Sequence, residues 1–128
     1  MPTYVTEEQV TSLISSVASS VNAKLDKTPT VRVITSSTES LQLSDVGNIV
    51  RYEGTVPCNL TIPLEASVSW PVNESINVNN AGTGLITVVE SGNTINATPS
   101  LVFRAQHSEA VFRYVGSDVW DASGDFAT

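Results

Sequence analysis

The chain changes its residue pattern once, at Thr28-Pro29, and this change restricts what it can fold into. Before it, apolar residues recur at spacings of four, three and four, at Val10, Ile14, Val17 and Val21. This period predicts a helix with the apolar seam of a short coiled coil. After it, the sequence has no helical period and contains short strand-like runs separated by Ser, Thr, Asn and Gly. A stripe this narrow cannot cover a globular core, so we expect the helix to pack against copies of itself.

The ends of this helix are marked by local signals. Thr6 followed by Gln9 forms a capping box, which predicts that the helix starts here. It should run to about Leu25, because the segment 26–29 ends in a proline. An isolated helix of this length is marginally stable in water, so association has to stabilise it. β-branched residues at both seam positions favour a trimer over a dimer.

One alternative remains open at this level. Leu13 and Leu25 widen the apolar stripe and favour a single helix that packs on its own β-domain. In either case the chain divides into residues 1–28, an N-terminal anchor and helix, and residues 29–128, a β-domain. We expect the first arrangement, a parallel homotrimer in which a short stalk carries one β-domain per chain.

Charge and composition exclude several classes of partner. The 128 residues carry a net charge of −7, and no lysine follows Pro29. The arginines of the β-domain are scattered along the sequence, so nucleic acid and anionic membrane surfaces are disfavoured as partners. The N-terminus lacks the pattern of a signal peptide, and no stretch is apolar enough to span a membrane. We therefore expect synthesis in a reducing cytoplasm without export.

The β-domain is expected to be an antiparallel sandwich or barrel-like domain, because evenly spaced short strands follow one another with no helix between them. We predict a hairpin that joins 76–78 to 85–89 across the Asn79–Gly84 turn. A second pair should join 101–105 to 110–114, and a Gly116–Asp118 turn should lead into Val119-Trp120. Further expected strands lie at 31–34, 41–43, 48–52, 60–64 and 94–96.

Candidate catalytic residues are few. The single histidine, His107, lies in a predicted turn next to Ser108 and Glu109, which is too close in sequence for an ordinary triad. Cys58 could act as a nucleophile only if the fold brought it to His107, and we expect it to be a small buried hydrophobe. Glu53 and Glu65 are expected to be surface acids. We predict no enzyme activity.

Two binding functions have candidate residues in the sequence. Asp118, Asp121 and Asp125 could hold a hard cation, but their spacing matches no calcium loop, so neither a metal nor another cofactor is predicted. Four aromatic side chains could stack on a sugar, although their apolar context favours the core: Tyr52, Trp70, Tyr114 and Trp120. Carbohydrate binding therefore stays the alternative function.

Several segments follow a recognisable order: Leu60-Thr-Ile-Pro-Leu, Trp70-Pro-Val, 76–84, Tyr114-Val-Gly-Ser-Asp-Val-Trp and Gly124-Asp125. Over about residues 40–126, this order resembles the small β-domain of tailed-bacteriophage virion proteins, which occurs in tail fibres and in head-decoration or head-fibre proteins. The tryptophan that follows a Gly-x-Asp turn is its most distinctive element. Asn73 departs from the pattern, which often has glycine at that position.

The resemblance implies a structural role in a virion. Such domains typically sit at the end of a trimeric stalk, and a stalk this short resembles a capsid decoration or head-fibre protein more than a tail fibre. A short tail fibre or receptor-binding protein is the alternative. The expected partners are copies of the chain itself and the major capsid protein or another virion protein. Tyr4 and Val5, which precede the helix, are the candidate capsid contact.

Overall fold

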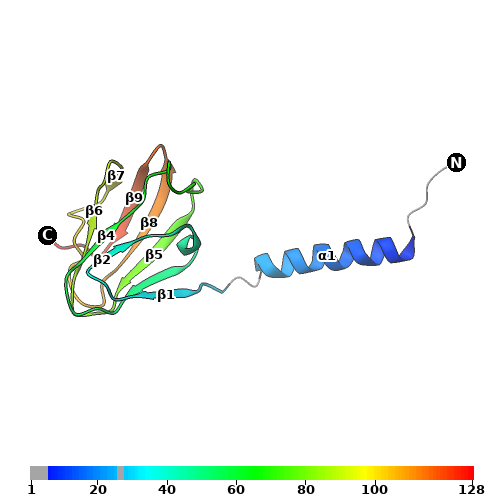
Figure 1. Ribbon diagram of the computed structural model, residues 1–128, viewed down its shortest axis with the longest axis horizontal. Coiled ribbons are helices and arrows are strands. Elements are labelled where there is room, and N and C mark those ends of the chain that lie inside the picture. The colour runs from blue at the N-terminus through cyan, green and yellow to red at the C-terminus, as the bar shows by residue number, and fades with distance from the viewer. Residues whose placement is uncertain (1–5, 26–27) are drawn as a thin grey trace.

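The computed structural model describes residues 6–25 and 28–128, and it describes side chains in these ranges apart from 19–25. The chain begins with one helix, α1 (Glu7–Leu25), which stands apart from a β-domain (Figure 1). The expected capping box is present, because the Thr6 amide donates to Gln9 Oε1 at 3.0 Å and the Gln9 amide donates to Thr6 Oγ1 at 3.2 Å. The helix therefore begins and ends where the sequence predicts.

The β-domain consists of two sheets, so the fold is mainly β as predicted. In the described part of the chain, the larger sheet has six strands in the order β1-β3-β5-β8-β9-β7 and the smaller has three in the order β2-β4-β6. A 3₁₀ turn, η1 (Leu43–Asp45), lies between β2 and β3. The strands are β1 (Val31–Ile34), β2 (Thr38–Ser40), β3 (Ile49–Tyr52), β4 (Cys58–Thr61), β5 (Ser75–Asn80), β6 (Ile86–Val89), β7 (Thr94–Asn96), β8 (Glu109–Gly116) and β9 (Val119–Gly124).

Strand pairing differs from the antiparallel arrangement expected from the sequence. The first six strands alternate between the two sheets, and β1, β3 and β5 pair in parallel, as do β2, β4 and β6. Only β5 with β8 and β8 with β9 pair antiparallel among the named strands. Parallel strands need a long crossover, and here each crossover contains a strand of the opposite sheet in place of a helix. The result is an arrangement like a short β-solenoid.

The predicted hairpin across Asn79–Gly84 is wrong, because this segment is a corner between the two sheets. Buried Asn80 holds it: Nδ2 donates to the carbonyls of Gly82 and Gly84, and Oδ1 accepts from the Ile86 amide. Neither glycine adopts a positive φ. They are required for space, because a Cβ on Gly82 would lie 2.0 Å from the Gly54 carbonyl oxygen.

The last part of the domain is partly as predicted. The Gly116–Asp118 turn joins β8 to β9, and both Ser117 and Asp118 adopt positive φ there. The predicted pair of 101–105 with 110–114 does not form. Instead Val102 bridges Thr87 of β6, and Phe103 bridges Phe126, so this segment extends the smaller sheet.

The core lies between the two sheets and is formed by one continuous apolar cluster. Trp70 and Trp120 meet edge to face at 5.1 Å, and Tyr114 lies 5.0 Å from Trp120. Cys58 is fully buried, as predicted. The largest fully buried side chains are those of Trp120, Tyr52, Tyr114, Phe103, Phe112, Leu41, Leu60, Ile62, Ile76, Ile86, Val50 and Val78.

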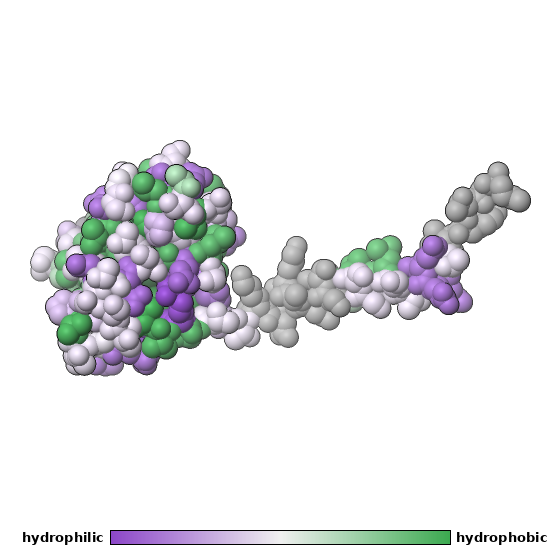
Figure 2. Space-filling model, viewed as in Figure 1, coloured by the Kyte–Doolittle hydropathy of each residue, from purple (hydrophilic) through white to green (hydrophobic). Residues whose placement is uncertain are grey.

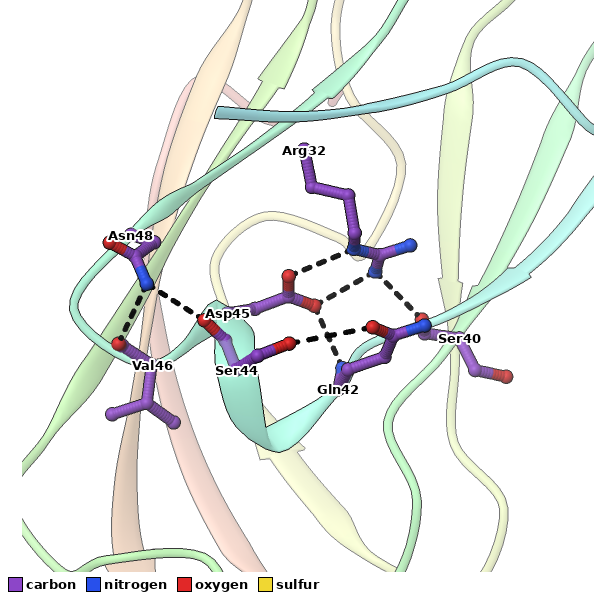
Figure 3. Close-up of polar contacts among 7 residues, drawn as sticks. All are labelled: Arg32, Ser40, Gln42, Ser44, Asp45, Val46 and Asn48. Atoms are coloured by element: carbon purple, nitrogen blue, oxygen red, sulfur yellow. Dashed lines mark hydrogen bonds and ion pairs between the residues drawn. The ribbon is translucent and has the colours of Figure 1, made fainter. Parts of the chain in front are cut away.

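An ion pair between partly exposed Arg32 and buried Asp45 connects β1 to the chain that follows β2 (Figure 3). Arg32 donates from Nε and Nη2 to the two carboxylate oxygens of Asp45, at 2.9 and 2.8 Å, and also to the Ser40 carbonyl. Asp45 is buried and accepts a further bond from the Gln42 amide at 2.7 Å. The hydrogen bonds that Arg32 donates to Asp45 are the main cause of the raised pKa of Arg32. The first strand is therefore fixed to the domain by its own side chain.

Candidate functional site

Helix α1 carries an exposed apolar stripe. Val10 is 43% exposed, Ile14 61% and Val17 54%, and neighbouring Leu13 is 65% exposed. These four side chains therefore do not pack on the β-domain, which overturns the alternative of a single helix folded onto its own chain. Figure 2 shows apolar surface gathered on one side of the first part of the helix. The side chains of Val21 and Leu25 lie outside the described set.

A second apolar surface lies on the six-stranded sheet, on the face turned away from the core. Strand register places Val31, Ile49, Asn77, Val111 and Ser123 side by side in one row across β1, β3, β5, β8 and β9. We call this row and the two that flank it the outer face. One flanking row contains Val33, Arg51, Asn79 and Glu109, and the other contains Ser75, Arg113, Asp121 and Asn96.

The outer face is hollowed along its length. One depression lies between β3, β5 and β8, and a second lies between β5, β8 and β9; Ser75 and Val111 line both. A third continues past Asp121 towards β7. All three are shallow and open. This is the geometry of a contact surface for another macromolecule and does not enclose a small ligand.

Two amide oxygens in the outer face lack a hydrogen-bond partner among the described residues. They are Oδ1 of Asn77 and Oδ1 of Asn79, both on the central strand β5 and both covered by neighbouring side chains. Asn77 lies between Ile49 and Val111, so apolar groups cover its amide oxygen. Buried polar groups are nearly always paired, and an unpaired one is costly.

The point where the chain enters the outer face is fixed by hydrogen bonds. The Thr30 amide donates to Asn48 Oδ1 at 3.0 Å, and the Ile49 amide donates to the Thr30 carbonyl at 2.9 Å. Asn48 Nδ2 in turn donates to the Ser44 carbonyl at 2.7 Å (Figure 3). The β-domain therefore holds the chain rigidly up to Thr30, immediately beside the apolar row.

The residues considered as catalytic candidates lie in separate local environments. His107 is exposed in a turn with φ of 73°. Ser108 donates from Oγ to Asp125 Oδ2 at 2.8 Å, and Asp125 is held bidentately by Arg104. Ser108 is thus bound to a carboxylate that is itself paired with Arg104. These contacts hold the 104–109 turn in place.

The environment of Cys58 disfavours the reactive thiolate form. Burial, together with the charge of Glu39, raises its pKa to about 11, so the nucleophilic thiolate is scarce at neutral pH. The two glutamates also have separate roles. Glu53 pairs with Arg51 at 3.5 Å, whereas Glu65 accepts a hydrogen bond from the Tyr114 hydroxyl at 2.8 Å.

The three C-terminal aspartates are engaged separately and do not converge. Asp118 accepts from the Glu65 amide at 2.7 Å, Asp121 from Asn96 at 3.0 Å, and Asp125 from Arg104. Within residues 6–25 and 28–128, no group of three or more His, Cys, Asp or Glu side chains is placed to hold a metal ion. In the same part of the chain, no helix has the length and apolarity needed to cross a membrane.

The aromatic residues that could stack on a sugar are all in the core. Tyr52, Trp70, Tyr114 and Trp120 are each no more than 3% exposed, so none offers a ring face to a ligand. Trp70 Nε1 donates to the Pro63 carbonyl at 2.8 Å, which fixes its ring inside the domain. Tyr4 and Val5, the predicted capsid contact, lie outside the described residues.

The chain matches no protein-family model and no curated protein. The candidate functional features that the structure offers are two surfaces, namely the seam of α1 and the outer face. The sequence predicted the first but not the second. The sequence signal for the outer face was the alternation in β1, where Val31 and Val33 are exposed on either side of Arg32.

Proposed function

We propose that this chain is a structural protein of a bacteriophage virion, a homotrimeric capsid decoration or head-fibre protein. The observation that carries the proposal is the exposed seam of α1, whose apolar residues are spaced for a coiled coil and are not covered by the β-domain. The phage setting is supported by the order of strand and turn segments described above. The protein would be made in the host cytoplasm and act on the assembled virion.

The proposed mechanism is multivalent attachment. Each chain would contribute one weak contact to the major capsid protein or another virion protein, through the N-terminal segment that contains Tyr4 and Val5. Three chains joined by the stalk would engage together, and the high effective concentration of the second and third contacts would raise the overall affinity by about 100-fold or more. The β-domain would face outward, with the negative net charge of the chain keeping particles apart.

The test uses labelled full-length protein with undecorated capsids and, separately, with susceptible cells. The parent protein should saturate capsids at a fixed stoichiometry and leave cells unlabelled. A variant with Ile14→Asp and Val17→Asp, which disrupts the seam, should bind capsids at least about 100-fold more weakly because it binds singly. Binding to cells but not to capsids would contradict the decoration role and favour a short tail fibre or receptor-binding protein.

A further inference from the structure

We propose that the outer face of the six-stranded sheet is a second self-association surface, which packs against the β-domains of the other two chains around the stalk axis. The inference rests on the proposed trimer and specifies which side of each β-domain turns inward. Figure 2 shows apolar surface on the β-domain over β1, beside the point where the chain leaves for the helix.

Chain length places β1 close to the axis. Only five residues separate the last residue of α1, Leu25, from the first residue of β1, Val31. Six peptide steps reach at most about 20 Å. Because Thr30 is held by Asn48, the start of β1 is also fixed within the domain. In a trimer whose helices pack about 8–10 Å apart, the part of each β-domain nearest the axis is therefore β1 and the row of residues beside it.

The chemistry of the outer face fits another copy of the same face. Val31 and Val33 are each 52% exposed, and Val111 is 36% exposed, so apolar area remains uncovered in a single chain. Neighbouring copies carry the same valines, so association of this face with its own copies would cover apolar area on each chain.

Charge also favours a second copy over other partners. The chain as a whole carries −7, so copies repel one another over most of their surface. The outer face carries both signs, with Arg51 and Arg113 beside Glu109 and Asp121, and Arg51 also pairs with Glu53 just after β3. A face that carries both signs can complement itself across a rotation axis. Three copies can meet there with the least repulsion.

The first experiment measures the trimer dissociation constant by sedimentation equilibrium for full-length variants. Val31→Asp and, separately, Val111→Asp should raise it at least about 10-fold, because each places a charge in a covered apolar row. Val56→Asp is the matched control. Val56 is 47% exposed and lies in the corner between β3 and β4, away from the outer face, so its effect should stay below about 3-fold.

The second experiment remains informative even if an aspartate variant fails to fold. Hydroxyl-radical footprinting compares the parent with the seam variant Ile14→Asp/Val17→Asp, which keeps the outer face intact. Oxidation of Val31, Val33 and Val111 should fall several-fold in the trimer, whereas oxidation of Val56 should not change. Protection that appears only when capsids are added would instead assign the face to the capsid.

The outcomes separate this inference from the proposed function. A trimeric parent whose Val31→Asp and Val111→Asp variants dissociate like the Val56→Asp control would overturn the second surface and leave the stalk. A parent that is monomeric at every concentration would overturn both.

Discussion

The two regions of this molecule use apolar residues in opposite ways. In the β-domain, apolar side chains meet between two sheets, and twelve of the largest are fully buried within one chain. In α1, Val10, Ile14 and Val17 recur at coiled-coil spacing and remain exposed. Full burial of a side chain of this size contributes about 1.5–3 kcal/mol to stability. The seam residues are about half exposed, so part of this free energy is not gained at each position in a single chain. The β-domain therefore buries its large apolar side chains within one chain, whereas those of the helix would be covered only in the proposed trimer.

The largest expected effect comes from breaking the helical side of this contrast. Ile14→Asp with Val17→Asp places two charges per chain in the seam, where they would be buried without partners. We expect the trimer dissociation constant to rise by at least about 100-fold, with α1 losing its helical signal and the β-domain keeping a cooperative melting transition. Sedimentation velocity and circular dichroism measure the two effects.

The control for the seam variant is Ser12→Asp with Ser15→Asp, which places the same charges on the outer side of the helix. This control should remain a trimer. Equal dissociation of both variants would mean that added charge, and not loss of the seam, separates the chains.

The next largest effect should come from the β-domain, where the corner at Gly82 packs against the chain at Gly54. Gly82→Ala would bring a Cβ to 2.0 Å from the Gly54 carbonyl oxygen, and both groups are backbone-fixed. We expect a loss of about 3 kcal/mol in the free energy of unfolding, because the two corners must separate. Urea titration followed by tryptophan fluorescence checks this, since Trp70 and Trp120 are both buried.

Gly92→Ala is the matched comparison for the corner glycine. Gly92 has a φ of 99°, but an added Cβ there would meet only Leu64 at 3.5 Å. Its expected cost is about 1 kcal/mol from backbone conformation alone. A cost for Gly92→Ala equal to that of Gly82→Ala would show that close stacking of the corners is not the dominant requirement.

A third effect tests the attachment of β1 to the domain. Arg32→Met removes both charge-assisted bonds to Asp45, whose side chain is only 3% exposed, and should cost about 3 kcal/mol in the free energy of unfolding. Adding Asp45→Asn should recover part of this loss, because the buried charge is then gone. The expected recovery is specific to a buried ion pair, and a double variant less stable than the single one would contradict it.

The smallest expected effect concerns acid. Arg104, followed by Ser108, lowers the pKa of Asp125 below its ordinary value. A depressed native pKa stabilises the fold at pH values above the unfolded pKa, and this contribution is lost as pH falls through the native pKa. Asp125→Asn should therefore lower the melting temperature slightly near pH 6 and flatten its decline below about pH 4. The pair is exposed, so the change should be small. Identical acid profiles for both proteins would contradict it.

The sequence predicted the local features of both regions and missed how the strands connect. The capping box of Thr6 and Gln9, the turn at Gly116–Asp118 and the burial of Cys58 depend on neighbouring residues or on apolar character alone, and all three are present. The parallel pairing was missed because a strand that returns through a second sheet has the same alternating pattern as a strand in a hairpin. The corner at Asn80 illustrates this, since Gly82 and Gly84 are equally typical of a hairpin turn and of a corner between two sheets.

The candidate surfaces were predictable to different degrees for the same reason. A helix seam shows as a period in one segment, so Val10, Ile14 and Val17 were identifiable. The outer face combines single residues from five strands, and only the register brings Val31, Ile49 and Val111 into one row.

The most direct test of the central claim is the mass of the full-length protein in solution. Sedimentation equilibrium over a wide range of concentrations should give three times the chain mass of 13.6 kDa, about 41 kDa, with dissociation only on dilution. This is the result expected if the exposed seam of α1 joins three parallel chains. A mass of 13.6 kDa at every concentration would contradict the account, because the helix would then remain uncovered and the stalk would not exist.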